Sequence, residues 1–267
     1  MQPIVINVYK KCGQTPLECI GDLKKKHKEL ASLPMTYAGR LDPLAEGVLL
    51  ILLGDECLKK EDYLNLSKEY EVEILFGFAT DTYDLMGKVI SSPEILFERS
   101  SDEGDGSHGQ TISNSISGLD FVIKKFIGII KQKYPPYSSR PVNGRPLFMW
   151  AREGKLDEIE IPTHDVFIEK IELIKEKEIN GKMLFEKIKK DISKVNGDFR
   201  QKEILAFWKN ELKDKYQEKY PVIKLRVVCG SGVYMRSLAH EIGQMMGVPS
   251  FALNIIRTKV GEYTINY

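Results

Sequence analysis

A single carboxylate, Asp42, lies between a leucine and a proline in the stretch TYAGRLDPLAEGVL, residues 36–49. Aspartate before proline commonly opens a turn, which is one interpretation of this residue. Glycines bracket the centre of the stretch and permit tight backbone geometry, and Leu41 and Leu44 place apolar bulk around the carboxylate. Because an ionised carboxylate is costly in such surroundings without a cationic partner, the alternative is a carboxylate held by a cation for chemistry.

Arg236, in GVYMRSLAHEIG, is a candidate for that partner. It falls in the first turn of a predicted helix, where the macrodipole disfavours a cation. A carboxylate elsewhere would explain its position, although a surface arginine fits the local pattern equally well. Asp81 and Asp84 in TDTYD are either turn residues or members of an Asp–Arg–Asp network. Tyr70 is either a core tyrosine or an aromatic platform for a base.

Strands and helices are mixed in the elements that must position these residues. Alternation over residues 68–78 (KEYEVEILFGF) predicts a strand with one packed face, which ends just before TDTYD. Residues 4–9, 47–54 and 222–230 also predict strands, and GSG after the last leads into a helix at 233–247. No regular βαβ alternation is evident, so the predicted fold class is α+β with a largely antiparallel sheet.

Capping signals and apolar spacing predict further helices. Thr15 can cap a helix that begins at Pro16, and Glu18 completes a capping box. Apolar residues recur at helical spacing over 119–130, which predicts another helix before a proline-rich segment.

Two segments are predicted to be insertions in one domain of residues 1–267. Residues 98–118 are rich in Ser, Gly and Asp and show no apolar periodicity, which indicates a polar loop. Residues 176–220 carry two amphipathic patterns, which predict a helical hairpin.

Composition restricts the class of protein. Hydrophobic residues make up 42% and charged residues 29%, which is ordinary for a globular protein. No apolar run approaches the roughly 18 residues of a membrane span, and the N-terminus lacks signal-peptide order, so a cytoplasmic location is expected. The four cysteines have no CxxC spacing and there are only four histidines, which argues against a zinc site or disulfides. A net charge of +1 neither demands nor forbids a nucleic-acid partner.

Five blocks together resemble, in order, those of the TruB-type tRNA pseudouridine synthases. They are AGRLDPLAEGVL, KEYEVEILFGFATDTYD, YPPYSSRPVNGRPLFMWAREG, VVCGSGVYMRSLAHEIG and IIRTKVGEY. The resemblance covers nearly the whole chain apart from the two insertions, and it implies a pseudouridine synthase fold and an isomerase. By this resemblance Asp42 matches the nucleophilic aspartate, Arg236 the arginine paired with it, and Asp84 the acidic residue that also contacts that arginine.

The resemblance also assigns residues to the substrate. Tyr70 matches the tyrosine that stacks on the target base, and Tyr234 and Ile255 match positions that line the base pocket. The family usually has a histidine six residues before its aspartate, and this histidine helps to recognise the tRNA loop. Tyr37 stands one residue nearer, five before Asp42, and is the residue that matches when the Leu-Asp-Pro blocks are superposed. Lys10 lies near the family's Lys-Pro element, with a second lysine in place of the proline.

The function implied is isomerisation of the T-loop uridine of tRNA, position 55, to pseudouridine after base flipping. The resemblance implies no cofactor or metal, the T-arm stem-loop of tRNA as partner, a monomer, and no C-terminal RNA-binding domain of the PUA type after Tyr267. One alternative is a non-catalytic RNA-binding or tRNA-folding factor. Another is a hydrolase with Asp42 and Asp84 as an acid–base pair. The intact set of Asp42, Tyr70, Asp84 and Arg236 favours the synthase.

Overall fold

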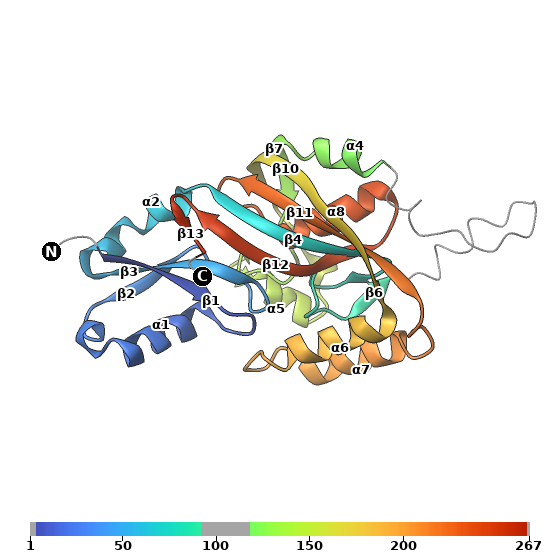
Figure 1. Ribbon diagram of the computed structural model, residues 1–267, viewed down its shortest axis with the longest axis horizontal. Coiled ribbons are helices and arrows are strands. Elements are labelled where there is room, and N and C mark those ends of the chain that lie inside the picture. Colours follow the sequence, from blue (N-terminus) through green and yellow to red (C-terminus); the bar gives the residue numbers. More distant parts are fainter. Residues whose placement is uncertain (1–3, 92–117, 266–267) are drawn as a thin grey trace, which may run out of the picture.

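A nine-stranded sheet forms the centre of the molecule, which the computed structural model describes over residues 4–91 and 118–265 (Figure 1). Its strands are β1 (Ile4–Lys10), β2 (Met35–Ala38), β3 (Glu46–Leu53), β4 (Lys68–Phe76), β7 (Gly128–Lys133), β10 (Thr163–Asn180), β11 (Lys219–Cys229), β12 (Ser250–Val260) and β13 (Tyr263–Thr264). In space they follow the order β1-β3-β12-β4-β11-β10-β7, with β2 paired to β3 and β13 to β12. Among these described strands the pairings are antiparallel except that of β12 with β3. The predicted α+β class with a largely antiparallel sheet is confirmed.

Helices and two small strand pairs complete the fold. The helical segments are α1 (Pro16–Lys26), η1 (Lys28–Leu30), η2 (Gly54–Lys59), α2 (Lys60–Asn65), α4 (Leu119–Lys124), α5 (Leu147–Arg152), η5 (Leu156–Glu158), α6 (Gly181–Ile192), α7 (Gln201–Glu211) and α8 (Met235–Met246). The strand pairs are β5 (Ala79–Thr80) with β6 (Val89–Ser91), and β8 (Pro141–Val142) with β9 (Arg145–Pro146). The capping box of α1 is confirmed, because Thr15 and Glu18 each accept a hydrogen bond from the other's backbone N–H.

The alternation predicted for β4 is confirmed, and this strand lies in the sheet between β12 and β11. Tyr70 and Val72 are buried, whereas the intervening glutamates are half-buried. Lys68 is in phase with the buried set and is itself only 6% exposed. The packed face of β4 therefore carries a cation as well as the aromatic ring of Tyr70.

Strand β3 is buried on both faces, which explains its continuous apolar run. Leu49 and Ile51 pack in one cluster with Cys19 and Leu23 of α1. The alternate residues of β3 pack on the other side with Val260 of β12.

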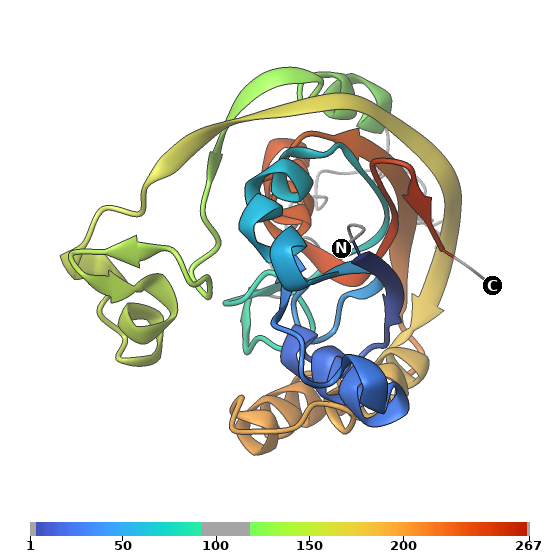
Figure 2. The ribbon, with the colours of Figure 1, turned by 90° about the vertical axis from the view of Figure 1, so that its left-hand side faces the viewer.

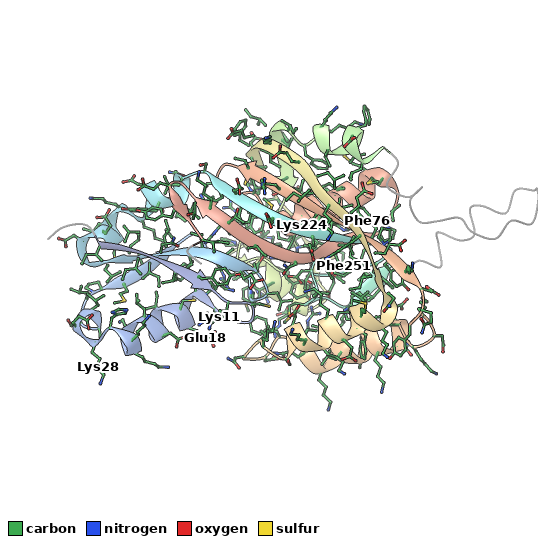
Figure 3. The ribbon with its side chains drawn as sticks, viewed as in Figure 1. Lys11, Glu18, Lys28, Phe76, Lys224 and Phe251 are labelled. Carbon is green, nitrogen blue, oxygen red and sulfur yellow. The ribbon has the colours of Figure 1, made fainter. Side chains whose placement is uncertain are left out.

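Helices cover both faces of the remaining sheet. Helices α4 and α8 pack with the face that carries Tyr70 and Phe76, whereas α6 and α7 pack with the opposite face, which carries Leu75 and Phe251. Phe76 and Phe251 belong to the neighbouring strands β4 and β12 (Figure 3). Trp208 of α7 is fully buried, with its ring centroid 5.3 Å from that of Phe78.

The segment that carries β8, β9 and α5 stands off from the sheet. It joins the end of β7 to the start of β10 and projects to one side of the molecule in Figure 2. The strands β7 and β10 that support it are paired over their whole common length, from Thr163 with Lys133 to Ile168 with Gly128.

Two predicted segments differ from the structure. The helix predicted over 119–130 is wrong beyond Lys124, because Gly128 adopts φ +101° and begins β7. After that glycine, burial alternates along β7, with Gln132 buried between the exposed Lys131 and Lys133. Residues 176–220 contain the two helices α6 and α7, but 176–180 continue β10 and 219–220 begin β11. The predicted polar insertion at 98–118 lies outside the described residues except for Gly118.

None of the helices in the described part of the chain is both long enough and apolar enough to cross a membrane.

Gly47 is required where β3 meets β12. It has φ +112°, and a Cβ added to it would lie 2.2 Å from the carbonyl oxygen of Arg257. We expect Gly47→Ala to lower the free energy of unfolding by more than about 3 kcal/mol, because both the conformation and the contact are unfavourable to alanine. Gly54→Ala is the control, since Gly54 also has positive φ but has no atom within 4 Å of the added Cβ, so it should cost about 1 kcal/mol. Urea denaturation measures both, and equal losses would contradict the prediction.

Candidate active site

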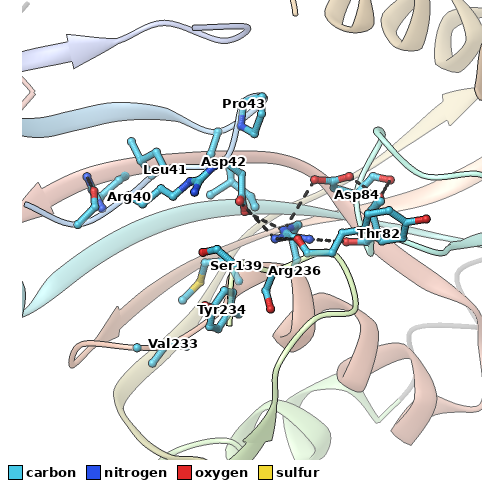
Figure 4. Close-up of a pocket in the computed structure, with 18 of the residues that line it drawn as sticks. Arg40, Leu41, Asp42, Pro43, Thr82, Asp84, Ser139, Val233, Tyr234 and Arg236 are labelled. Carbon is cyan, nitrogen blue, oxygen red and sulfur yellow. Dashed lines mark hydrogen bonds and ion pairs between the residues drawn. The ribbon is translucent and has the colours of Figure 1, made fainter. Parts of the chain in front are cut away.

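A cavity of about 720 Å³ opens beside β4 and β12 (Figure 4). Several segments far apart in the sequence line it, including 39–43, 137–139 and 230–236. Six of the seven residues predicted to act in the site line this cavity: Asp42, Tyr70, Asp84, Tyr234, Arg236 and Ile255. The fold thus brings together side chains that are far apart in the sequence, since Asp42 and Arg236 are 194 positions apart.

The guanidinium of Arg236 is the centre of the site. Its side chain is 4% exposed, and it lies in the first turn of α8 as predicted. Nε donates to Oδ2 of Asp42 at 2.7 Å, and Nη2 donates to Oδ1 of Asp42 at 3.3 Å. Nη1 donates to the carbonyl of Thr82 at 2.8 Å, and Nη2 also donates to the carbonyl of Tyr137 at 3.3 Å. Three separate chain segments therefore supply its acceptors.

Asp42 sits at the boundary between this buried cation and the cavity. Its side chain is 33% exposed, against 4% for its partner Arg236. The fork of two hydrogen bonds fixes the plane of the carboxylate. Each carboxylate oxygen has a second lone pair, so both oxygens can act on a group in the cavity while they stay bonded to the arginine.

Asp84 approaches the guanidinium from another side. Its Oδ2 is 3.8 Å from Nε of Arg236, and its Oδ1 accepts hydrogen bonds from the Thr82 hydroxyl at 2.6 Å and the Met86 N–H at 2.9 Å. Burial raises the pKa of the Asp84 carboxyl above its ordinary value, although the charge of Arg236 opposes the shift. The predicted Asp–Arg–Asp network is present as geometry, with Asp42 as the member more open to the cavity.

The loop that carries Asp42 is anchored by a buried lysine. Lys10 is fully buried at the end of β1, and its ammonium donates to the carbonyl of Pro43 at 3.1 Å and to that of Ala45. The N–H of Gly13 donates to the same Pro43 carbonyl at 2.9 Å. Burial lowers the pKa of Lys10 to about 8. The cost of burying this cation is met by carbonyl groups on the residues that follow Asp42.

The aromatic and apolar side of the cavity comes from Tyr70, Tyr234 and Ile255. Tyr70 is 9% exposed and packs in the cluster that includes Ile255. Tyr234 is the N-cap residue of α8, and the buried side chain of Gln132 bonds both its N–H at 2.8 Å and its carbonyl at 3.2 Å. These contacts hold the backbone next to Arg236.

Tyr37 is not brought to the cavity. It lies on β2, half-buried, and packs against the cluster between α1 and β3. The Lys60 ammonium is 5.5 Å from its ring centroid. The role of Tyr37 in recognising an RNA loop stays a prediction.

Two buried cations of the cavity wall were missed. Lys68 and Arg257 both line the cavity and are 6% and 1% exposed. Lys68 is in phase with Tyr70 on β4, and Arg257 is in phase with Ile255 on β12. The strand periodicity could have found both, because residues two apart share a face. The carbonyls of Thr82 and Tyr137 could not be predicted in this way, because a main-chain carbonyl does not depend on the residue type.

Comparison with known proteins identifies a family. Residues 28–186 match the family model described as TruB family pseudouridylate synthase (N terminal domain). A protein of Ligilactobacillus salivarius named tRNA pseudouridine synthase B is 31% identical over 98% of this chain and 68% of its own length. A protein of the same name from Bacillus pumilus is 28% identical over 98% of this chain and 66% of its own length.

Solved structures share the fold. The structure entitled Crystal Structure of a Cbf5-Nop10-Gar1 Complex has a chain that matches with a TM-score of 0.53 and 19% identity. The match covers 98% of this chain and 50% of that chain. This chain therefore spans about two thirds of the length of the two curated relatives and about half of that solved chain.

The acceptors around Arg236 make a conservative change there costly. Arg236→Lys keeps the charge but not the fork, so the buried carbonyls of Thr82 and Tyr137 lose their donors. We expect the free energy of unfolding to fall by about 2–4 kcal/mol. The control is Arg226→Lys, at an arginine 42% exposed and 3.4 Å from Glu71, where the loss should stay below about 1 kcal/mol. Urea denaturation would contradict the prediction if the two losses were equal.

Proposed function

The chain belongs to the TruB family of pseudouridylate synthases, and from this premise we propose that it isomerises a uridine of tRNA to pseudouridine with Asp42 as the catalytic carboxylate. The observation that carries the proposal is the forked bond between the buried Arg236 and the partly exposed Asp42 at the cavity. The names of the relatives support tRNA as the substrate.

The reaction sets the requirements for the site. The N1–C1′ bond of the uridine breaks, the C5–C1′ bond forms, the C5 proton leaves and N1 gains a proton, so the product is an isomer of the substrate. A carboxylate serves either by attacking C1′ or by removing the proton at C2′. Both roles need an ionised oxygen that faces the sugar.

Asp42 meets these requirements because one side of its carboxylate contacts Arg236 and the other side faces the cavity. On the protein side, the positively charged guanidinium of Arg236 donates two hydrogen bonds to the carboxylate and fixes its plane. On the cavity side, the exposed third of the side chain leaves lone pairs for the substrate. Asp84 lies 3.8 Å from Nε of Arg236 and holds that cation from behind.

The rest of the cavity suits a flipped nucleotide. Its volume of about 720 Å³ lies in the range of small-molecule sites. Flipping a base out of a folded loop costs a few kcal/mol of unstacking, and a stacking face on Tyr70 would return about 1–3 kcal/mol. Tyr234 and Ile255 add apolar wall beside it.

Two rival functions fit the geometry less well. A hydrolase would need Asp84 as a second acid or base, but this side chain is 11% exposed and its Oδ1 already accepts two hydrogen bonds. A non-catalytic tRNA-binding factor would have no use for a carboxylate that a buried arginine holds open to the cavity.

Recognition of the T-arm, modification at position 55, a monomeric state and a cytoplasmic location are further parts of this proposal. They rest on the sequence blocks shared with the family. A tRNA whose T-loop uridine 55 is replaced by cytidine tests the position, because it should no longer be modified.

Asp42→Asn tests the catalytic role. We expect the rate of tritium release from tRNA labelled at uridine C5 to fall by at least about 10³-fold, because an amide is neither a nucleophile nor a base here. Binding of the same tRNA, measured by filter retention, should stay near that of the wild type.

The matched control is Asp165→Asn, at an exposed aspartate on β10 whose Oδ1 lies 3.6 Å from Lys131. Its tritium release should equal that of the wild type. Release by Asp42→Asn at the wild-type rate would refute the assignment. Absence of release by the wild-type protein itself would refute the proposed function.

A further inference from the structure

The connection between α6 and α7 forms part of the cavity wall. Asp198, Phe199 and Arg200 line the cavity together with Tyr137 and Arg152. The connection belongs to the segment predicted from the sequence to be an insertion, so the five family blocks assign it no role. Its last residue, Arg200, has its side chain 16% exposed and points into a set of polar and aromatic contacts.

Arg200 joins two side chains from different parts of the chain. Its Nη1 donates to Oδ2 of Asp81 at 2.8 Å, and its Nη2 donates to Oδ1 at 3.3 Å. The guanidinium carbon also lies 4.4 Å from the ring centroid of Tyr137. The Tyr137 hydroxyl donates to Oδ2 of Asp81 at 3.3 Å, which closes a triangle of contacts. Forked ion pairs and stacked guanidinium groups are geometries that lysine does not reproduce.

The two residues that Arg200 joins belong to the segments that supply the carbonyl acceptors of Arg236. Asp81 immediately precedes Thr82, whose carbonyl accepts from Nη1 of Arg236 at 2.8 Å. Tyr137 supplies its own carbonyl to Nη2 of Arg236 at 3.3 Å. Arg200 therefore ties together the two backbone segments that supply the carbonyl acceptors of Arg236.

The backbone at Arg200 supports a specific role. This residue has φ +63°, a left-handed conformation that is unfavourable for a residue other than glycine. Such conformations persist where the surrounding contacts over-determine them, and they cluster at functional sites. Arg200 is the N-cap residue of α7, and in this conformation its guanidinium contacts Asp81.

We propose that Arg200 is a positioning residue of the reaction, which fixes the carbonyls of Thr82 and Tyr137 and so the orientation of Arg236 and Asp42. This proposal rests on the proposed function for its kinetic readout. Arg200 acts on the rate of the bound substrate and not on RNA affinity, because its guanidinium is occupied by Asp81 and Tyr137. The loop between α6 and α7 is in this sense part of the active site.

The test compares Arg200→Met with Arg145→Met. Arg145 makes the same two kinds of contact, an ion pair with Glu153 and a stack with its guanidinium carbon 4.7 Å from the Trp150 ring centroid, but it does not line the cavity. We expect Arg200→Met to lower kcat for tritium release by about 10–100-fold, the scale of a small misplacement of catalytic groups. Its KM for tRNA should change little, and Arg145→Met should leave kcat unchanged.

Two further single variants and one double variant extend the test, and the single variants keep the proposal falsifiable if Arg200→Met folds poorly. Asp81→Asn should lower kcat in the same way, and the double variant with Arg200→Met should be no worse than either single change, because both remove one unit. Arg200→Lys should lose most of the rate as well. A loss confined to KM, or additive losses in the double variant, would overturn the proposal.

A measurement that does not depend on catalysis distinguishes a failure of this proposal from a failure of the proposed function. Amide hydrogen exchange of the free protein should quicken in peptides that cover 81–86 and 134–140 in Arg200→Met but not in Arg145→Met. If the wild type released no tritium, this exchange would still show whether Arg200 holds these segments. Unchanged exchange in both peptides would overturn the proposal whatever the activity.

Discussion

The cost of burying one guanidinium governs the arrangement of this molecule's site. Arg236 is almost completely buried, and an uncompensated buried cation would be strongly destabilising. Its acceptors come from the loop between β2 and β3, the turn after β5 and the segment after β7. The chain can fold with Arg236 inside only if these three segments converge on the start of α8. The cavity is the space that their convergence leaves beside the sheet.

The segments that meet at Arg236 are themselves fixed by contacts further out. Lys10 and Gly13 hold the loop of Asp42 through the Pro43 carbonyl. The turn that carries Asp84 is pinned to β12, where the N–H of Ala252 donates to the carbonyl of Tyr83 at 3.0 Å. The start of α8 is held by Gln132 of β7. Each anchor uses a main-chain group, so the side chains of Asp42, Asp84 and Arg236 remain available to one another and to the cavity.

The sequence predicted side chains in the site better than it predicted what surrounds them. Asp42 and Arg236 could be paired in advance, because a cation in the first turn of a helix and a carboxylate among leucines each lack a local explanation. The choice of Asp84 over Asp81 came from the family resemblance. The carbonyls of Thr82 and Tyr137 could not be predicted, because any residue supplies a carbonyl. The contacts of Arg200 depend on a helical hairpin whose place over the cavity has no local signal. Tyr37 was assigned by alignment alone, and the packing of β2 on β3 holds it elsewhere. The helix predicted through Gly128 failed because apolar spacing over so short a run fits a strand as well.

The way in which the other buried cations are satisfied shows what is particular about Asp42. Lys10 donates to the carbonyls of Pro43 and Ala45, Lys68 to those of Leu64 and Leu66, and Arg257 to those of Val48 and Gly39. Within the described part of the chain, none of these three cations forms an ion pair with a carboxylate. Burial lowers the pKa of both lysines to about 8. Each lysine nevertheless stays buried, with its ammonium bonded to main-chain carbonyls. Carbonyl groups are thus sufficient to bury a cation in this protein. A buried ion pair gives little stability in return for its desolvation, so the pairing of Arg236 with two carboxylates is better explained by chemistry at the cavity than by stability.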